Sequence, residues 1–301
     1  MRLYVIGSEG QVSRSLRDVA AAMPDIVFGF GTRPLVDLLK PDSVARALAD
    51  FSPDIVVNPA AYTAVDKAEI EPELAFAINR DGARTVATAA ERIGAPIIHL
   101  STDYVFDGRK PTSYVEADPP APLGVYGRSK LEGEHAVAAS NPCHVILRTS
   151  WVYAPFGHNF VRTMLRLAGE RDTLRVVNDQ IGCPTYALDI AHAVIRVARN
   201  LHMEGCQDRL KGITHLAGPD AMTWYTFARN IFAASKMQSN RNITVEPITT
   251  PDFPTIATRP ANSCLSTARL KSEFGISLPS FDSSLTDCLV HISNSQQGRQ
   301  S

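Results

Sequence analysis

A tyrosine and a lysine at helical spacing, Tyr126 and Lys130, are residues whose types and separation could do acid–base chemistry. On a helix, side chains at this spacing lie on one face. An unperturbed phenol titrates at about 10, and a neighbouring ammonium is expected to lower that pKa towards neutrality. The pair predicts that Tyr126 donates a proton to a carbonyl oxygen as a nicotinamide hydride reaches the carbon, with Lys130 also holding the nicotinamide ribose. The alternative is a pair of surface neighbours.

An apolar run that ends abruptly in hydroxyl and acidic groups supports the catalytic interpretation. Residues 97–101 are typical of a buried strand, and Thr102 and Asp103 follow directly. Ligands of open α/β sheets bind at the carboxyl ends of the strands. Thr102, or with less support Ser101, is therefore predicted to hydrogen-bond the reacting carbonyl oxygen and to stabilise the developing alkoxide. The alternative is a simple turn that closes the strand.

A turn with two glycines follows the first apolar run. Gly7 and Gly10 stand between residues 3–6 and a segment with helical apolar spacing. In a dinucleotide-binding turn, the first glycine permits the tight bend and the second lets a pyrophosphate approach the backbone at a helix N-terminus. Ser13 replaces the third glycine, and its small side chain is expected to keep the helix packed with a slight displacement. The alternative is an ordinary strand-to-helix turn, in which glycine is common.

The residues after the second predicted strand bear on the choice of cofactor. Enzymes that prefer NAD usually place an acid there for the ribose hydroxyls. This sequence instead reads Gly31-Thr32-Arg33. Arg33 is predicted to pair with a 2′-phosphate, which favours NADPH, with NADH as the alternative reductant and a partnerless surface arginine as the alternative role.

These side chains need a framework, and the chain supplies one in which strands and helices alternate. Strands are predicted from β-branched runs at 3–6, 26–30, 55–58, 96–102, 145–152, 175–178 and 213–217. Helices are predicted from apolar spacings at 43–51, 73–93, 127–139, 159–169, 186–200 and from residue 223 onwards. The alternation predicts an α/β fold of the Rossmann type, a doubly wound parallel sheet covered on both faces.

The alternation loosens after about residue 156, which predicts two lobes. We expect a dinucleotide-binding domain over 1–155, with 179–218 returning to it. A smaller, mainly C-terminal substrate-binding lobe is expected over 156–178 and 219–292. The polar tail 293–301 is expected to be frayed.

The bulk composition excludes several classes of protein. With 45% hydrophobic and 20% charged residues, the 301-residue chain is that of a globular protein. A net charge of -1 gives no general attraction for nucleic acid, and no run is long enough to span a membrane. No signal peptide precedes the first strand. The odd number of cysteines without a Cys-x-x-Cys pair predicts free thiols, no metal and a cytoplasmic location, the five being Cys143, Cys183, Cys206, Cys264 and Cys288.

Seven short segments spread over nearly the whole chain form one pattern. They lie at residues 7–12, 58–69, 101–108, 126–130, 148–153, 179–185 and 259–263. Together they resemble the RmlD-like group of dTDP-4-dehydrorhamnose reductases in the extended short-chain dehydrogenase/reductase family. The resemblance implies NAD(P)H-dependent reduction of the C4 keto group of dTDP-4-dehydro-β-L-rhamnose, a dTDP-linked 4-keto deoxysugar, to dTDP-L-rhamnose.

The resemblance also implies roles for individual residues. Those expected to line the dinucleotide are Gln11, Val12, Asp37, Leu38, Ala61, Tyr62 and Thr63. Those expected to touch the deoxysugar are Thr102, Asp103 and Trp151, with Leu100 beside them. Some members carry an acid after the glycine turn for a metal at a dimer contact, but this chain reads Ser13-Arg14-Ser15. We carry over neither that metal nor that dimer, and a homodimer of another kind stays open.

Three other functions remain as alternatives. Sugar-nucleotide dehydratases of this type place Asp and then Glu after the catalytic Thr, whereas Tyr104 follows Asp103 here, so an elimination lacks its base. An epimerase or a reductase of another 4-keto sugar is a second possibility. The third is a regulatory subunit resembling the β subunit of methionine adenosyltransferase, which binds nucleotide without known reductase activity. Retention of Thr102, Tyr126 and Lys130 favours catalysis.

Overall fold

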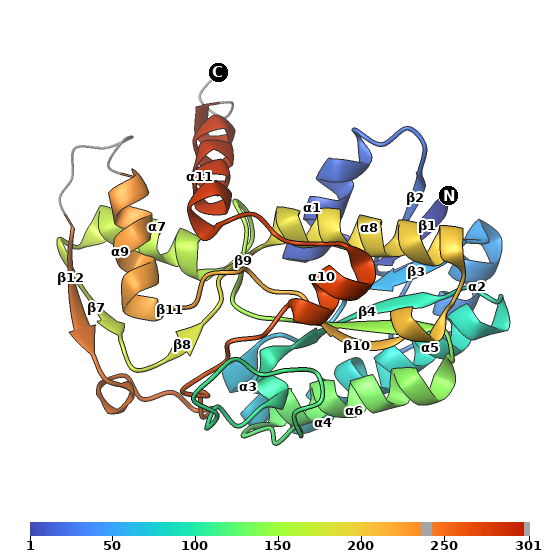
Figure 1. Ribbon diagram of the computed structural model, residues 1–301, viewed down its shortest axis with the longest axis horizontal. Coiled ribbons are helices and arrows are strands. Elements are labelled where there is room, and N and C mark those ends of the chain that lie inside the picture. Colours follow the sequence, from blue (N-terminus) through green and yellow to red (C-terminus); the bar gives the residue numbers. More distant parts are fainter. Residues whose placement is uncertain (236–242, 298–301) are drawn as a thin grey trace.

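The computed structural model describes residues 1–235 and 243–297, and its centre is one parallel sheet (Figure 1). The six strands stand in the order β10-β5-β4-β3-β1-β2. Their bounds are Arg2–Ile6 (β1), Val27–Gly31 (β2), Ile55–Asn58 (β3), Ile97–Thr102 (β4), His144–Thr149 (β5) and Gly212–His215 (β10). The order runs outward in opposite directions from β1 and β3, so the winding reverses between these two strands. The predicted doubly wound α/β fold is confirmed.

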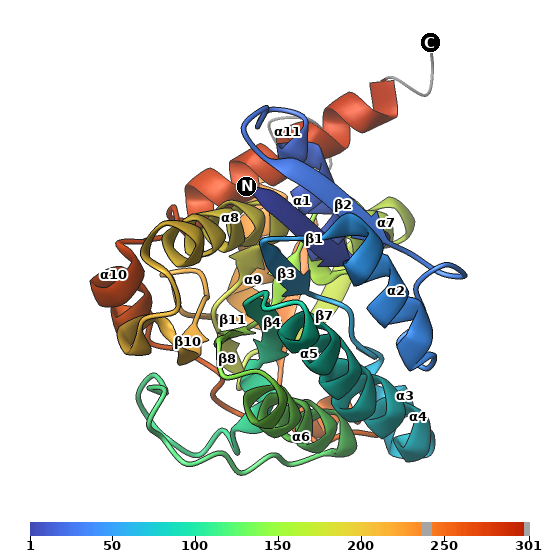
Figure 2. The ribbon, with the colours of Figure 1, turned by 90° about the vertical axis from the view of Figure 1, so that its right-hand side faces the viewer.

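Helices cover both faces of this sheet (Figure 2). One face carries α1 (Gln11–Ala20) and α8 (Ala187–Glu204), and the other carries α2 (Pro41–Phe51), α5 (Ala83–Arg92) and α6 (Val125–Ser140). Strand β1 explains how both faces are filled, since successive side chains of a strand point to opposite sides. Leu3 and Val5 join the core beneath α1 and α8, whereas Tyr4 and Ile6 join the core beneath α2 and α5.

The predicted helix 73–93 is divided into three pieces. These are α4 (Pro72–Phe76), the π-helical turn η1 (Ala77–Gly82) and α5, and α3 (Val65–Ile70) precedes them. The buried Asn79 lies in the π turn, where its side chain accepts from the N–H of Tyr62 at 2.8 Å and donates to the Ser129 hydroxyl at 2.9 Å. The backbone oxygen of Asn79 lies so close to Gly133 that no side chain would fit at that position of α6. The widened turn thereby docks this segment against α6.

The predicted strand 145–152 is interrupted at Trp151. Strand β5 ends at Thr149, and the two-residue β6 (Val152–Tyr153) pairs with β9 (Thr185–Tyr186) outside the main sheet. Trp151 has a φ of 46°, in the left-handed region that bulky side chains rarely adopt. The prediction of one continuous strand was wrong, because this backbone reversal turns the chain away from the sheet.

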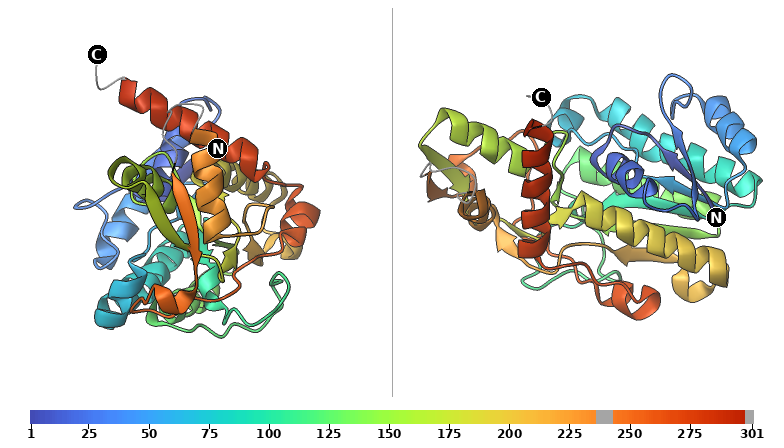
Figure 3. Two further views of the ribbon diagram at one scale, coloured as in Figure 1. Left: turned by 90° about the vertical axis from the view of Figure 1, so that its left-hand side faces the viewer. Right: turned by 90° about the horizontal axis from the view of Figure 1, so that it is seen from above.

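A second group of elements packs beside the sheet around a core of its own (Figures 1 and 3). Its helices are α7 (Phe160–Glu170), α9 (Trp224–Ser235) and α11 (Phe281–Gln297). Its paired strands are β7 (Thr173–Val177) with β12 (Thr244–Ile248), and β8 (Ile181–Gly182) with β11 (Met222–Thr223). The short elements are η2 (Asp103–Val105), η3 (Asp208–Leu210), η4 (Thr250–Asp252) and α10 (Ala268–Phe274), the last beside β10.

A frayed C-terminal tail and the lack of a membrane-spanning segment were both predicted from the sequence. The tail 293–301 was expected to be frayed, but α11 continues through Gln297, and residues 298–301 lie outside the described part of the chain. Among residues 1–235 and 243–297, none of the helices combines the length and the apolar character that crossing a bilayer requires.

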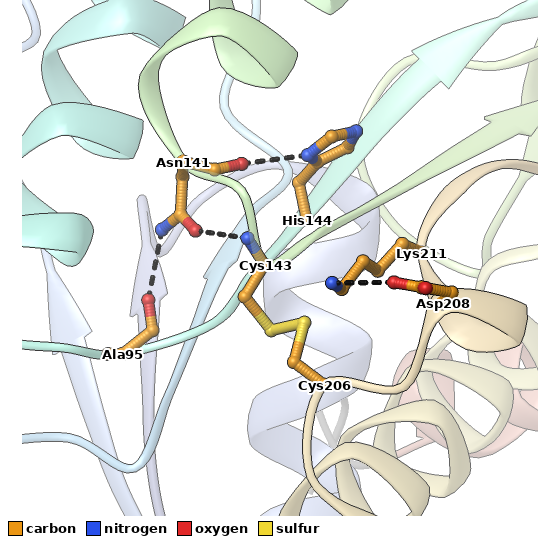
Figure 4. Close-up of a disulfide and its surroundings, with 7 residues drawn as sticks. All are labelled: Ala95, Asn141, Cys143, His144, Cys206, Asp208 and Lys211. Carbon is orange, nitrogen blue, oxygen red and sulfur yellow. Dashed lines mark hydrogen bonds and ion pairs between the residues drawn. A yellow bond between two sulfur atoms is a disulfide. The ribbon is translucent and has the colours of Figure 1, made fainter.

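The expectation that all five cysteines are free thiols was wrong. Cys143 and Cys206 form a disulfide with their Cα atoms 5.6 Å apart, whereas the other three are free and buried (Figure 4). Cys143 immediately precedes β5, and Cys206 lies in the connection to its neighbour β10. Asn141 supports the bend, because its side chain donates to the Ala95 carbonyl at 3.0 Å and accepts from the Cys143 N–H at 2.8 Å. Parallel neighbours bring distant segments together, a proximity that cysteine spacing cannot reveal.

Candidate active site

A cleft of about 690 Å³ opens at the carboxyl ends of the central strands. It is bordered by the turns after β1, β2 and β3, by the ends of β4 and β5, and by the first turn of α6. The cleft thus lies where the winding of the sheet reverses, the usual ligand position in this architecture. The predicted site residues that line it are Gly7, Gly10, Gln11, Val12, Arg33, Asp37, Leu38, Ala61, Thr63, Leu100, Thr102, Asp103, Tyr126, Lys130 and Trp151.

Tyr62 is the predicted site residue that the structure does not bring into the lining of the cleft. Its hydroxyl donates to the Glu71 carboxylate at 2.8 Å, on the outer side of the following helix. Its backbone N–H and carbonyl are both bonded to the side chain of Asn79. Tyr62 therefore anchors the segment that carries Ala61 and Thr63 into the cleft.

The glycine turn leads into the first turn of α1, whose backbone N–H groups have no partner within the helix. Gly7 has a φ of 88°, which only glycine adopts freely. Gly10 caps α1 with no side-chain hydrogen bond, and the first turn of α1 contains no acid. Ser13 is buried against the turn, so the small residue at the third position keeps the helix packed. The free N–H groups and the helix dipole suit a phosphate group, so the residues present fit a dinucleotide.

Arg33 lies exposed at the rim of the same cleft. In the described residues it has no ion-pair partner, so its guanidinium is available to an anion. Asp37, farther along the loop, uses a carboxylate oxygen to accept from the N–H of Leu39 at 3.0 Å. Among the residues that line the cleft, Arg33 carries the positive charge nearest to the end of β2.

Lys130 is buried beneath the floor of the cleft. Its ammonium donates to the carbonyl of Leu100 at 2.6 Å and lies 3.4 Å from Nε2 of His99. Burial lowers the pKa of Lys130 to about 8, and the carboxylate of Glu134, one turn along α6, acts in the opposite direction. The helix begins in place because Glu69 accepts from the N–H of Val125 at 2.7 Å.

The pKa of Tyr126 is raised, so the expectation that Lys130 would lower it was wrong. Burial raises the pKa of Tyr126, and the neighbouring Thr102 hydroxyl opposes that rise without cancelling it. The charge of Asp103 acts with burial, while the ammonium of Lys130 is directed to the Leu100 carbonyl. The phenol is therefore protonated throughout the neutral range, which is the state that a proton donor requires.

Thr102 and Asp103 form the polar end of β4. The Thr102 hydroxyl donates to one Asp103 oxygen at 2.9 Å and accepts from the N–H of Tyr104 at 3.2 Å. The other Asp103 oxygen, buried at the cleft, has no hydrogen-bond partner among the described residues. Burial raises the pKa of Asp103 to about 6, although the hydroxyls of Ser263 and Thr102 stabilise the charge. An unpaired buried carboxylate oxygen suits a hydroxyl of a ligand.

Trp151 forms an apolar wall at the far end of the cleft. Its indole stacks on that of Trp224 at a centroid distance of 3.4 Å and an interplanar angle of 6°. A side chain at Gly182 would collide with the same indole. Gly182 of β8 and Trp224 of α9 therefore hold the Trp151 indole in the direction set by its left-handed backbone. No pattern in the sequence around Trp151 indicated this contact.

Several functional neighbours were missed by sequence reasoning. Tyr104 lines the cleft and meets Tyr126 edge to face, with the ring centroids 5.5 Å apart. Arg259 lies over the Tyr104 ring at 5.8 Å and forms a 2.6 Å ion pair with Asp66. These residues are far apart in sequence, so only the family motifs that contain them could have signalled a shared role. His158, after β6, also lines the cleft and had no signal.

A buried ion pair underlies the site on the α6 side of the sheet. Glu134 and Arg148 are each 1% exposed and form two hydrogen bonds, at 2.9 and 2.6 Å. The Ser101 hydroxyl donates to the same carboxylate at 2.5 Å. Ser101, the alternative to Thr102 in the sequence analysis, thus faces α6 and supports this pair.

Comparisons with known proteins agree with one another. The family model of the RmlD substrate binding domain matches residues 1–294. A dTDP-4-dehydrorhamnose reductase of Sinorhizobium fredii is 51% identical over 284 residues, covering 94% of this chain and 95% of the relative. The crystal structure of such a reductase from Clostridium acetobutylicum has a TM-score of 0.90 at 34% identity, covering 97% of this chain and 100% of that one. The Bacillus anthracis reductase in complex with NADP has a TM-score of 0.87 at 34% identity, covering 96% and 98%.

Proposed function

We propose, from the premise that this chain belongs to the RmlD substrate binding domain family, that it reduces dTDP-4-dehydro-β-L-rhamnose to dTDP-L-rhamnose with NADPH. The reaction converts the C4 carbonyl to a hydroxyl, consumes one proton and leaves NADP⁺. The observation that carries the proposal is the meeting of Thr102, Tyr126 and Lys130 at one cleft that also presents a phosphate-binding turn. The Sinorhizobium fredii relative bears the name of this activity, and the Bacillus anthracis structure holds NADP.

The residues at the first half of the cleft would hold the cofactor. The backbone donors after Gly7 and Gly10 are placed for the pyrophosphate, and Arg33 for the 2′-phosphate. Asp37, Leu38, Ala61 and Thr63 lie along the same wall. The bound cofactor supplies the hydride that reduces the C4 carbon.

The chain itself supplies the proton and stabilises the oxygen. Tyr126 donates its phenolic proton to the C4 oxygen. The Thr102 hydroxyl, which donates to Asp103 in the structure, turns to donate its one hydrogen bond to the same oxygen as negative charge develops there. Lys130 lies one turn farther along α6, and its ammonium, bonded to the Leu100 carbonyl in the structure, supplies positive charge for the tyrosinate that remains, because charges interact more strongly in a buried site than in water. A protonated resting phenol and a charged lysine are the states that this direction of reaction needs.

The far end of the cleft would hold the deoxysugar. The free oxygen of Asp103 can accept a sugar hydroxyl, and the Trp151 indole can pack against the apolar face of the ring. Tyr104 occupies the position where a dehydratase places its second acid, and its ring packs on Tyr126. The site therefore lacks the carboxylate that a 4,6-elimination would use.

The division into lobes follows from this assignment. We assign 1–155 with 179–218 to cofactor binding and 156–178 with 219–292 to substrate binding. The dTDP-sugar is the small-molecule partner, and the balanced charge gives no reason to add a nucleic-acid partner. The cytoplasmic location expected from the sequence stays a prediction, and because Cys143 and Cys206 form a disulfide, five free thiols no longer support it.

Turnover against a panel of sugars tests the proposed function. Purified protein is mixed with NADPH and with dTDP-, UDP- or GDP-linked 4-keto sugars, and the loss of NADPH absorbance is followed. The dTDP-linked 4-keto deoxysugar is expected to give the highest kcat/KM, with dTDP-L-rhamnose as the product identified by mass and NMR. Absence of NADPH oxidation with every sugar would overturn the proposal.

Replacing Arg33 by Ala is expected to weaken NADPH binding about 10- to 100-fold, the loss of one charge-assisted hydrogen bond to a phosphate. NADH, which lacks the 2′-phosphate, should be affected less than about threefold by the same estimate. Both Kd values are measured by fluorescence titration. Arg92, exposed at the end of α5 and outside the lining of the cleft, offers a matched Arg92→Ala control. Equal losses for the two cofactors would reject the role of Arg33.

A further inference from the structure

Strand β4 carries a histidine that the proton chemistry described above does not use. Alternate residues of β4 face opposite sides of the sheet, and Ile98 and Leu100 join the core beneath α1 and α8. His99 points the other way, towards α6, and is fully buried. A buried polar side chain between a strand and the helix that carries Tyr126 requires a partner for each ring nitrogen.

Both ring nitrogens of His99 do have neighbours. Nε2 lies 3.4 Å from the ammonium of Lys130, and Nδ1 lies 3.2 Å from the side-chain nitrogen of Asn58. Asn58 is the residue directly opposite His99 on β3. The three side chains therefore form a buried row from β3 across β4 to α6, and it ends on the catalytic lysine.

The chemistry of these groups fixes the protonation of the ring. An ammonium has no lone pair, so Lys130 can only donate, and Nε2 must be the accepting nitrogen. The proton of the neutral ring then resides on Nδ1 and needs an acceptor. As placed, Asn58 turns its nitrogen to Nδ1, and its buried oxygen has no partner among the described residues. Exchanging the amide oxygen and nitrogen gives the Nδ1 proton an acceptor and the Asn58 oxygen a partner, and it leaves the amide nitrogen in the former place of the oxygen.

The His99 ring stays neutral and does not take up a second proton. Burial, followed by the charge of Lys130, keeps the pKa of His99 well below its usual range. The nearest carboxylate on α6, Glu134, is already bound to Arg148 and Ser101. The atoms that touch the Lys130 ammonium directly are therefore uncharged acceptors, the Leu100 carbonyl and the His99 ring.

We propose that His99, held by Asn58 as the tautomer protonated on Nδ1, is a positioning residue for the reduction that accepts a hydrogen bond from Lys130. It acts through the lysine and touches neither substrate nor cofactor. The ring restrains the ammonium and stabilises its charged form in a buried site. The inference rests on the proposed function, because the effect on turnover is read through that reaction.

The pH dependence follows from the groups around Lys130. Those on α6 and the elements packed against it are Tyr126, Glu134, His99, Asp103, Tyr104 and Arg148. The pKa of Lys130 is lowered to about 8, so its charge is present at neutral pH and lost as the pH rises. Removal of an acceptor disfavours the charged form further. The alkaline limb of the kcat profile should then move to lower pH.

Two substitutions at His99 test the contributions of Nε2 and Nδ1 separately. The amide of Gln can reach the position of Nε2 and accept from Lys130, whereas the shorter Asn reaches only the position of Nδ1. His99→Asn is expected to lower kcat about 10-fold and to move the alkaline limb down by about one pH unit, with KM nearly unchanged. His99→Gln should stay within about threefold of the unsubstituted enzyme and keep its limb. Identical profiles for the two variants would overturn the proposal.

A spectroscopic measurement decides the case without substrate. Protein labelled with ¹⁵N-histidine reports which ring nitrogen carries the proton, and the His99 signals are identified as those lost in His99→Gln or His99→Asn. A proton on Nδ1 is expected, and a proton on Nε2 would overturn the proposal even if both variants fold poorly. Because this readout needs no turnover, a failure of the proposed function is distinguishable from a failure of the His99 assignment.

Discussion

Replacing Tyr126 by Phe is expected to lower kcat by about 10²- to 10⁴-fold, the usual contribution of a positioned general acid. The substitution removes one oxygen and leaves the ring, which packs edge to face on Tyr104. NADPH affinity should change little, because the pyrophosphate and 2′-phosphate contacts lie at the other half of the cleft. Steady-state kinetics with the dTDP-linked 4-keto sugar and a direct NADPH titration measure the two quantities.

The same chemical change at another buried tyrosine provides the control. Tyr114 is 4% exposed, donates to Asp107 at 2.8 Å and does not line the cleft. Tyr114→Phe removes an equivalent hydroxyl and should keep kcat within about threefold, since the hydrogen bond that it loses, to the Asp107 carboxylate, lies outside the cleft. If Tyr126→Phe turned over as fast as Tyr114→Phe, the phenol could not be the proton donor.

Breaking the Cys143–Cys206 disulfide is expected to reduce the free energy of unfolding by about 4 kcal/mol. The bond joins residues 63 positions apart, and the chain-entropy estimate grows with the length of the closed loop. In a chain of this size, the midpoint of thermal unfolding should fall on the order of 10 °C. Calorimetry of the wild type with and without reductant measures the effect.

The double variant Cys143→Ser/Cys206→Ser shows whether the reductant acts through this bond. Its midpoint should match that of the reduced wild type and should not respond to reductant, and a buried free thiol offers the matched Cys288→Ser comparison. Turnover at low temperature should persist in all forms, because the disulfide precedes β5 and β10 whereas the cleft follows the strands. A wild type insensitive to reductant, together with an equally stable double variant, would show that the bond does not form in solution.

The fold could be predicted because its determinants are local. Residues 3–6, 55–58 and 97–102 alternate with helical patterns, and that periodicity alone specifies a parallel sheet with two covered faces. The predictions failed where contacts with distant residues determine the local backbone conformation. Trp151 leaves the strand because Trp224 and Gly182 receive its indole. Asn79 lies in a widened turn of its helix, where its side chain accepts from the Tyr62 N–H and donates to the Ser129 hydroxyl. No pattern along the chain encodes those contacts.

The site was predictable to the same extent and for the same reason. The motifs that place Thr102, Tyr126 and Lys130 are short, and they follow elements whose positions the periodicity had given. The sign of the Tyr126 pKa shift was not predictable, because it depends on how burial and the direction of the Lys130 ammonium balance. The contacts of His99, Glu134 and Arg148 could not be predicted, because the sequence does not show whether a buried polar side chain has a partner from another element.

The buried contacts between β4 and α6 also determine the register of the catalytic helix. His99 and Ser101 are two residues apart on the strand, and their partners Lys130 and Glu134 are four apart on the helix. Two strand residues rise about 6.7 Å and four helix residues about 6 Å, so both contacts close only in one alignment. Gly133 opposes a displacement of the helix on the side facing η1, because no larger side chain fits against the Asn79 backbone there. Displacement by a turn would leave buried charges without partners, so the polar contacts and the close packing at Gly133 together hold Tyr126 at the cleft.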